Sequence, residues 1–499
     1  MAASITVDAL TSALVARFLR SNNYSESLQA FIREADLPID AGQTSGDDTN
    51  NWTIQGLLEE KRAFDHSANF ERYAKGNKET ESWSVPAPSK ATVVNTPTSS
   101  NLLAASVESW QLPEYDADTS TTASVIVSTG ADRQVHLSKT SKDHDSIASF
   151  PGVSDSPVLS YVSLLKGRYV LMTNMSGRLV LLSGSRVLDN RKDHSKYAVK
   201  AVAYEEKCET DSSPHFWVAT AGWDATVYVY RIDIPNGEET PVIGEPIASI
   251  KLTTNPESLV FVRHIDTNEL VLLVSRRDST YIYYYQVPPL PKEINNLDQS
   301  GTDPDQSPST PTCPLLGQQN LAPHSNAWVA FSPAHMALSP HDPGLLAVAT
   351  STLPHMKVII VRLLFPSKSS LIAPNASEDA PVTQASQALE ALALQNREDA
   401  AILVQANTFA PQTAYSTPQI AWRPDGSGVW VNGDDGVIRG IETKTGKVVA
   451  TLKNGHEPGC KVRTIWAGYV DVPSEGEDIA QEEWVISGGF DKRLILWKA

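Results

Sequence analysis

The C-terminal stretch at residues 455–497 constrains the fold of this chain more than any other part of it. It contains three short runs of apolar and β-branched residues, at 461–466, 484–489 and 494–497. Such runs are typical of β-strands, and a tight turn at 490–492 separates the last two. The stretch therefore predicts a small sheet of three consecutive strands.

Four polar side chains lie in this stretch where a buried network would need them: His456, Ser487, Asp491 and Trp497. An imidazole, a hydroxyl and an indole N–H linked through a carboxylate satisfy one another beneath a sheet. His456 and Trp497 are 41 positions apart, which fits the ~40–45-residue unit of a β-propeller blade. The unit resembles a WD repeat. A Ser/His/Asp set can also indicate a nucleophile, but a set spread across one blade is interpreted as structural.

A second copy of the pattern lies earlier in the chain. Its members are His194, Thr220 and Asp224, with Tyr230 in the place of the tryptophan. Strand-like runs separated by turns continue over residues 101–499 and group into seven units. The sequence therefore predicts a mainly β fold, a seven-bladed propeller of the WD-repeat type.

The other units follow the pattern less closely. Asp132 and Asp278 occupy the turns of the first and fourth units, whereas the fifth unit, with 328–331 as its inner strand, lacks the aspartate. The remaining histidines are isolated, and we assign no role to them.

The last unit has only three strands, and its outermost strand would expose unpaired N–H and C=O groups. Residues 76–100, rich in Ser, Thr, Pro and Lys, are interpreted as a linker. Within this linker, 91–95 is a β-branched run long enough to pair with 494–497. We expect it to complete the last blade and to close the ring.

Two insertions interrupt the strand pattern. Residues 288–320 and 366–385 lack periodicity, and we interpret them as disordered loops. A run of strong helix formers follows at 386–399. Its apolar side chains would either enter a partner's groove or lie against the nearest blade: Leu389, Leu392 and Leu394.

The N-terminal residues 1–37 predict two short helices separated at Asn22-Asn23, because apolar residues recur there at helical spacing. So few residues cannot bury such a stripe alone. The pattern resembles the LisH motif, a short α-helical dimerisation module. The resemblance implies a dimer interface made of Leu14, Val15, Phe18, Leu19, Tyr24, Leu28 and Phe31. The alternative is a helical hairpin that docks on its own propeller.

Two positions differ from the LisH pattern. Asn23 replaces the usual glycine, and Leu28 replaces a small alanine. Asparagine tolerates a left-handed backbone, so we expect the turn to be retained. A further amphipathic helix is predicted at 52–73, within an additional helical segment at 38–75.

Bulk composition excludes several classes of protein. A net charge of −17 argues against general binding to nucleic acid or to anionic membranes. Three scattered cysteines favour a reducing compartment and argue against a metal site. The N-terminus lacks a secretory signal, and no apolar run is long enough to span a membrane. We expect an intracellular protein of the cytoplasm or the nucleus.

No motif for catalysis or for cofactor binding stands out, because the sequence lacks a phosphate-binding glycine loop, an H-E-x-x-H helix and a nucleophile elbow. The resemblance to LisH proteins with WD repeats implies a non-enzymatic scaffold. It would form homodimers through the helices and bind other proteins through the propeller faces. The same resemblance leaves open a subunit of a ubiquitin ligase or of a transcriptional co-repressor complex.

Overall fold

A computed structural model of the chain describes residues 7–43, 53–55, 83, 85–112, 122–141, 143–206, 214–235, 240–288, 310–323, 331–366, 384–473 and 479–499. The chain divides into two compact units, Met1–Gly76 and Asn77–Ala499. The first unit is helical, and the second is built almost entirely of strands.

The helical unit consists of α1 (Val7–Ser21) and α2 (Ser25–Glu34). Asn23 between them has a φ of 59°, the left-handed conformation expected for this turn. The chain then folds back onto α1, where Arg20 donates hydrogen bonds to the carbonyl oxygens of Ile39 and Ala41, both at 3.0 Å. A Cβ atom on Gly42 would lie 2.5 Å from a backbone nitrogen of α1, so only glycine fits this approach. Of the helix predicted at 52–73, only 53–55 lie in the described part of the chain.

The strands form seven four-stranded antiparallel sheets, which we number as blades in chain order. Blade one contains β2 (Leu102–Gln111), β3 (Thr122–Gly130), β4 (Val135–Lys139) and β5 (Ser146–Phe150). Blade two contains β6 (Val158–Leu164), β7 (Tyr169–Asn174), β8 (Arg178–Ser183) and β9 (Arg186–Lys192). Blade three contains β10 (Ala198–Glu206), β11 (His215–Gly222), β12 (Thr226–Asp233) and β13 (Ala248–Lys251). Blade four contains β14 (Pro256–Arg263), β15 (Leu270–Arg276), β16 (Tyr281–Gln286) and β17 (Leu315–Asn320).

The last three blades complete the ring. Blade five contains β18 (Pro333–Leu338), β19 (Leu345–Thr350), β20 (His355–Arg362) and β21 (Ile402–Pro411). Blade six contains β22 (Ile420–Trp422), β23 (Gly428–Val431), β24 (Ile438–Glu442) and β25 (Val448–Leu452). Blade seven contains β26 (Val462–Pro473), β27 (Ile479–Gly489), β28 (Leu494–Lys498) and, from the start of the propeller, β1 (Lys90–Val94).

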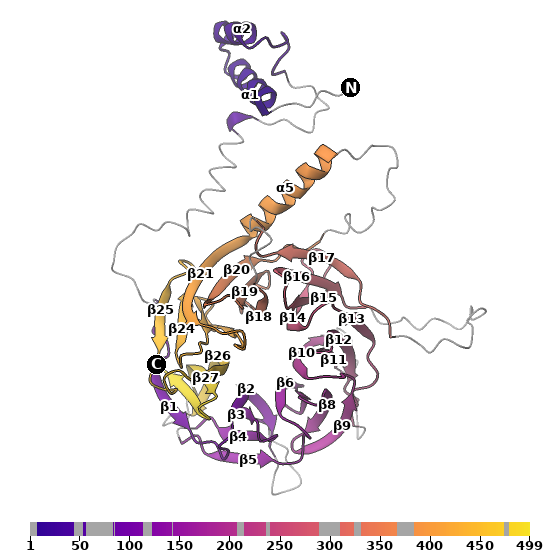
Figure 1. The fold of residues 1–499 in the computed structure, drawn as a ribbon, viewed down its shortest axis with the longest axis vertical. Coiled ribbons are helices and arrows are strands. Elements are labelled where there is room, and N and C mark those ends of the chain that lie inside the picture. Colours follow the sequence, from indigo (N-terminus) through magenta and orange to yellow (C-terminus); the bar gives the residue numbers. More distant parts are fainter. Residues whose placement is uncertain are drawn as a thin grey trace, which may run out of the picture. The chain divides into compact units, whose positions relative to one another are not determined.

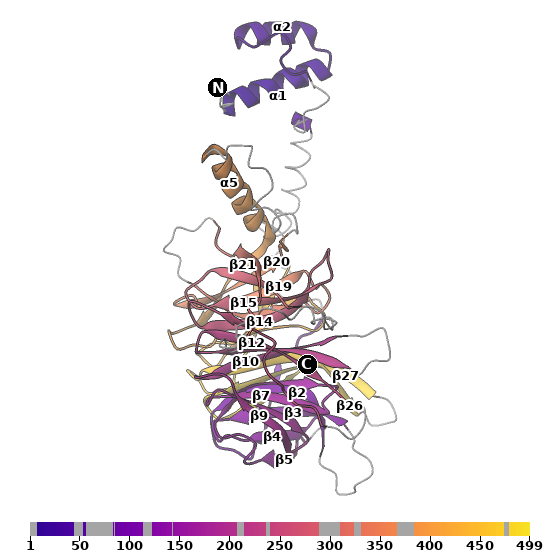
Figure 2. The ribbon, with the colours of Figure 1, turned by 90° about the vertical axis from the view of Figure 1, so that its right-hand side faces the viewer.

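The blades follow one another around a ring, with the first strand of each blade nearest the centre (Figure 1), and Figure 2 shows this ring from its side. Six of these inner strands contain a register shift near their start: β2, β6, β10, β14, β18 and β26. Such a β-bulge turns the extra side chain to a new direction. The bulge therefore recurs at the same level around the centre of the ring.

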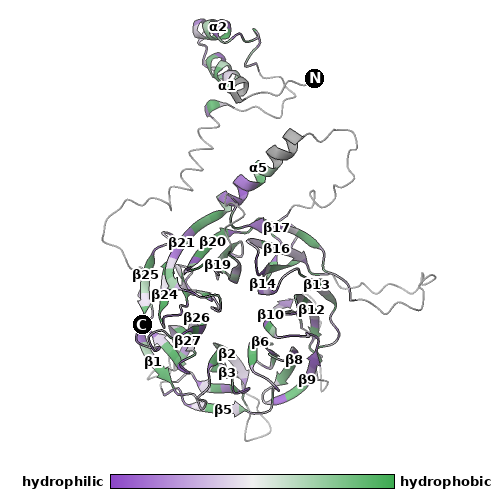
Figure 3. Ribbon diagram, viewed as in Figure 1, coloured by the Kyte–Doolittle hydropathy of each residue, from purple (hydrophilic) through white to green (hydrophobic). Residues whose placement is uncertain are grey.

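The core lies between neighbouring blades. The second strands β7 and β11 are buried along their whole length, and hydrophobic residues run along the strands of every blade (Figure 3). Leu171 of blade two and Tyr230 of blade three belong to one buried cluster. Each sheet thus buries both of its faces against its neighbours, as a closed ring of sheets requires.

The strand at the N-terminal end of the propeller closes the ring. β1 pairs antiparallel with β28, with Ala91 opposite Trp497 and Val94 opposite Leu494. Just before β1, Trp83 is buried over the positions of Gly428 and Gly440, where a Cβ atom would lie 2.3 Å from its ring. This arrangement pairs the edge of blade seven and anchors the segment that supplies its fourth strand.

Two boundaries expected from the sequence were wrong. Residues 315–320, assigned to a disordered loop at 288–320, form the outer strand β17, and Cys313 before it is buried. The polar sequence Leu-Leu-Gly-Gln-Gln-Asn hides this strand, because its one buried residue is Gln319 and no alternation of apolar residues marks it. The inner strand of blade five is β18, not 328–331; residue 331 lies just before it, and 328–330 lie outside the described residues.

The helix predicted at 386–399 is α5 (Gln384–Ala401), which leads directly into β21. Near its C-terminal end, Glu398 accepts a hydrogen bond from the backbone nitrogen of Asn320 at 2.7 Å. Leu392 and Leu394 are 51% and 45% exposed. This end of the helix is therefore fixed to blade four, while both leucines remain accessible to solvent.

Candidate functional site

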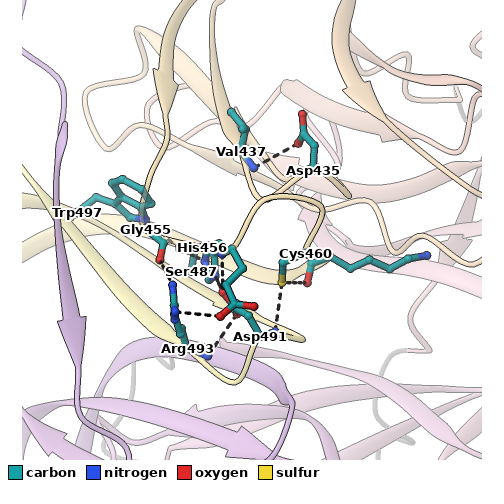
Figure 4. A network of polar contacts seen from close by, with 11 residues as sticks. Asp435, Val437, Gly455, His456, Cys460, Ser487, Asp491, Arg493 and Trp497 are labelled. Carbon is teal, nitrogen blue, oxygen red and sulfur yellow. Dashed lines mark hydrogen bonds and ion pairs between the residues drawn. The ribbon is translucent and has the colours of Figure 1, made fainter.

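Four polar side chains meet in blade seven (Figure 4). His456 Nε2 lies 2.8 Å from Ser487 Oγ, and Trp497 Nε1 donates to the same oxygen at 2.9 Å. His456 Nδ1 lies 3.0 Å from a carboxylate oxygen of Asp491. Ser487 and Trp497 are fully buried, and His456 is 4% exposed. The structure thus brings together all four residues that the sequence placed in this network.

Asp491 is held in the turn between β27 and β28. The next residue, Lys492, has a φ of 66°, and the carboxylate accepts backbone hydrogen bonds from Glu457 at 3.0 Å and from Arg493 at 3.3 Å. Burial raises the pKa of Asp491, but the hydrogen bonds from His456 and the backbone outweigh it and lower the pKa to about 2. The charged carboxylate therefore ties the loop that enters the blade to the turn that ends it.

The same residues resemble a nucleophilic triad in outline. Because Nδ1 of His456 faces a carboxylate, that nitrogen carries the proton, and Nε2 accepts the hydroxyl proton of Ser487. The Ser487 oxygen is fully buried and also accepts from Trp497. A substrate cannot reach this oxygen, so the arrangement supports the sheet rather than nucleophilic attack.

Cys460 lies next to this network. Donor atoms of His456, Cys460 and Asp491 all lie within 4.8 Å of one another, as the ligands of a metal ion would. However, the backbone nitrogen of Asp491 already donates to the Cys460 sulfur at 3.2 Å. Burial, with the Asp491 charge, raises the pKa of the thiol to about 11. A protonated thiol beside a hydrogen-bonded His–Asp pair fits a network of hydrogen bonds better than a metal site.

Blade three repeats the network with one difference. His194 Nε2 lies 2.9 Å from Thr220 Oγ1, and His194 Nδ1 lies 3.1 Å from Asp224. Tyr230 occupies the register position of Trp497, but its hydroxyl donates to Asp193 at 2.9 Å. The network of blade three therefore also includes Asp193, the residue that precedes His194.

Blade one contains a related contact that the sequence reasoning missed. His136 Nε2 lies 2.8 Å from a carboxylate oxygen of Asp132, four residues earlier, and His136 Nδ1 lies 2.8 Å from Ser149 Oγ. The histidine that holds the turn aspartate comes here from the third strand of the blade rather than from the entering loop. A histidine four residues after the turn aspartate is the sequence signal that would have identified this contact.

The turns held by these networks expose aromatic side chains. Trp223 directly precedes Asp224, and Phe490 directly precedes Asp491; their side chains are 40% and 41% exposed. Trp223 also contacts the ring of Tyr197, at a centroid distance of 5.1 Å. Each network thus fixes the position of an aromatic residue that solvent can reach.

All of the predicted dimer residues except Tyr24 lie on α1 or α2. Leu14, Val15, Phe18, Leu19 and Phe31 are half-buried, and Leu28 is buried. Tyr24, between the helices, is 52% exposed and contacts the ring of Phe18 at a centroid distance of 6.4 Å. Within one chain, the helical unit therefore covers its apolar stripe only in part.

Comparison with known proteins gives two matches, both to models of one family. The model described as UCP007778, LisH domain, matches residues 9–43, and the model described as UCP007778, beta-propeller domain, matches residues 324–497. The chain combines a small helical region that matches a LisH domain with a seven-bladed β-propeller. The LisH match spans α2 and most of α1, and the propeller match spans blades five to seven.

No curated protein matches the chain. Within the described residues, each helix is too short or too polar to cross a bilayer. LisH domains and propellers are architectures of protein–protein interaction, and this architecture is consistent with a scaffold.

Proposed function

We propose that this protein is a non-enzymatic scaffold that forms a homodimer through its LisH domain and presents its propeller to other proteins. The main support is the partly exposed apolar stripe of the helical unit. Two short helices bury little apolar surface, and a second copy would cover the half-buried side chains on α1.

The propeller would supply the binding surface for partner proteins. Trp223 and Phe490 are exposed on turns whose backbone is fixed by buried His–Asp contacts. Exposed aromatic residues on rigid supports bind partners with little loss of side-chain entropy. Pairing of two chains would double the number of such surfaces and raise avidity without new contacts.

Light scattering coupled to size-exclusion chromatography tests the pairing. We expect the wild-type protein to have twice the 54.2 kDa mass of one chain. Phe18→Asp places a charge in the apolar stripe and should give the single-chain mass. Gln29→Asp adds the same charge at an exposed position of α2 and should leave the dimer intact. A wild-type protein of single-chain mass would refute the pairing.

Proximity labelling in living cells tests the scaffold role. The wild-type protein and a Trp223→Ala/Phe490→Ala variant with an unchanged melting temperature would be compared. We expect the variant to lose a reproducible set of labelled neighbours. Recovery of ligase or chromatin subunits in that set would define the complex, whereas identical sets for both proteins would contradict a role for this surface.

A further inference from the structure

The centre of the ring holds basic side chains in a cavity of about 520 Å³. The cavity is lined by the inner strands of blades one, two, three, five, six and seven. Three of its residues carry basic groups without a carboxylate partner among the described ion pairs: Lys200, His335 and Arg463. One carboxylate, that of Glu108, also lines the cavity and accepts a hydrogen bond from Ser106 at 2.8 Å. The carboxylate of Glu257, which influences Arg463, is hydrogen-bonded to Arg277 at 2.8 Å. This local excess of basic groups contrasts with a chain of net charge −17.

The position of Lys200 departs from a regular structural pattern. In four inner strands, the residue that follows the bulge accepts a backbone N–H from the next blade, at distances of 3.1–3.3 Å: Ser160, Ser258, His335 and Thr464. Lys200 holds the same position in β10. An ammonium group cannot accept a hydrogen bond. Instead the side chain reaches His335 of blade five, so it does not contribute to the contact between neighbouring blades.

The contact between Lys200 and His335 fixes the protonation of both groups. Nδ1 of His335 accepts the backbone N–H of Ile420, which places the ring proton on Nε2. Lys200 Nζ lies 3.2 Å from this Nε2. Two donors would face each other if Lys200 were charged, so the contact requires a neutral amine with a free lone pair. Burial, with the Arg463 charge, lowers the pKa of Lys200 to about 8, so the amine passes between its charged and neutral forms near this pH.

Arg463 is the extra residue of the bulge in β26 and lines the same cavity. Burial disfavours its charge, and only the influence of Glu257 offsets this effect. A guanidinium keeps its proton in proteins and offers a planar set of donors that matches an oxyanion. Arg423 also lines the cavity but is paired with Glu483. The cavity therefore contains one permanent cation without a carboxylate partner, Arg463, and a neighbouring amine that can become a second.

We propose that the central channel binds a small oxyanion, such as phosphate or a carboxylate, between the Arg463 guanidinium and the Lys200 amine. Binding favours the protonated form of the amine, whose long side chain then turns from His335 to the anion. The guanidinium donates two parallel hydrogen bonds to the same anion. This site is independent of chain pairing and of the exposed aromatic turns.

Isothermal titration of inorganic phosphate into the purified full chain at pH 7.5 and constant ionic strength tests the site. We expect one saturable site per chain. Arg463→Gln and Lys200→Met should each weaken binding by roughly tenfold or more, the loss expected for a charge-assisted hydrogen bond. Arg186→Gln removes an exposed charge of blade two and should leave binding unchanged. Absence of saturable binding, or equal binding by Arg463→Gln, would overturn the proposal.

The melting temperature of each variant shows whether it is folded. If Arg463→Gln does not fold, the phosphate affinity of Lys200→Met alone decides the test. Acetate titrated in the same way distinguishes a carboxylate from a phosphate as the preferred anion, and binding of either supports the site.

The pH dependence tests the role of the amine separately. Sulfate keeps its charge between pH 7 and pH 10, so any change in its affinity comes from the protein. Affinity should fall as the pH rises through about 8, where Lys200 loses its proton. Arg463 stays charged, and His335 stays neutral because its pKa is lowered by burial and by Lys200. Burial raises the pKa of Glu257 and of Glu108, but both carboxylates are also present in Lys200→Met, so the difference between the two pH profiles reports the amine. A flat profile for the wild type, or an equal slope in Lys200→Met, would contradict the proposal.

Discussion

At the scale of single residues, the hydroxyl of Ser487 serves two buried nitrogens at once. It donates to His456 and accepts from Trp497, and both partners are buried. Unmade hydrogen bonds at buried groups are costly, because the groups have already lost their contacts with water. The network in blade seven therefore depends on a side chain of only two heavy atoms.

Ser487→Ala removes both hydrogen bonds but leaves the packing almost unchanged. We expect the free energy of unfolding to fall by about 2 kcal/mol, the penalty for unsatisfied buried polar groups. Denaturant titration monitored by tryptophan fluorescence measures the loss. Ser195→Ala, at an exposed position in the equivalent loop of blade three, should change the stability little; an equal effect of both substitutions would contradict the network.

Asp491 predicts an acid-sensitive contribution to stability. Its pKa is lowered from 3.8 to about 2 in the folded protein, so its stabilisation is complete above about pH 5 and is lost as the pH falls toward 2. A difference of this size corresponds to about 2 kcal/mol. Asp491→Asn should therefore reduce the decrease in unfolding free energy between pH 5 and pH 2 by that amount.

Denaturant titrations of the wild type and of Asp491→Asn at several pH values measure this change. Asp233→Asn removes a carboxylate whose side chain is 59% exposed and serves as the matched control. If Asp491→Asn had the same pH profile as the wild type, the carboxylate would not be the group responsible.

At the scale of elements, the sequence predicts those strands and turns that a short run of neighbouring residues is enough to identify. The turns at Asp224 and Asp491 each follow a buried strand and precede another, and their histidines lie 30 and 35 residues earlier in the chain. β17 could not be identified, because its partner β16 lies on the far side of a long insertion and its own residues are mostly polar. The contact between Lys200 and His335 joins blades three and five, and no pattern in the neighbouring sequence of either residue predicts it.

Trp83 shows a second kind of element-level feature that the sequence conceals. Its ring lies against Trp430 at a centroid distance of 5.0 Å and beneath the guanidinium of Arg423 at 4.5 Å. The space it fills exists because blade six has glycine at positions 428 and 440. A tryptophan in a linker gives no sign that two distant glycines leave room for it.

Two truncations test the closing strand. The fragment 77–499 retains Trp83 and β1, whereas 97–499 lacks both. We expect the shorter fragment to melt lower by on the order of 5 °C or more, because it loses a buried tryptophan and leaves β28 as a bare edge. Circular dichroism at increasing temperature measures the difference. Equal melting temperatures would show that β1 contributes nothing to closure.

At the scale of the whole molecule, the helical unit and the propeller differ in what stabilises them. The propeller buries large clusters between all neighbouring blades, such as the one joining blades three and four. The helical unit leaves much of its stripe half-exposed. If the helices are completed by a second chain, their stability depends on protein concentration while that of the propeller does not.

Thermal unfolding at several concentrations tests this difference. We expect the helical signal at 222 nm to include a transition that moves to higher temperature as the concentration rises. Phe18→Asp should lower that transition and remove its concentration dependence, with the propeller transition unchanged. A single transition that is independent of concentration in the wild type would argue against completion by a second chain.

The pairing of β1 with β28 also affects how the protein is made. The two strands are separated by about 400 residues, the distance from Val94 to Leu494, which a ribosome synthesises on the order of half a minute apart. During that interval the first six sheets can assemble, but the circle remains open and its first strand waits without a partner. A nascent chain therefore keeps this edge open to misassociation until its final strand emerges.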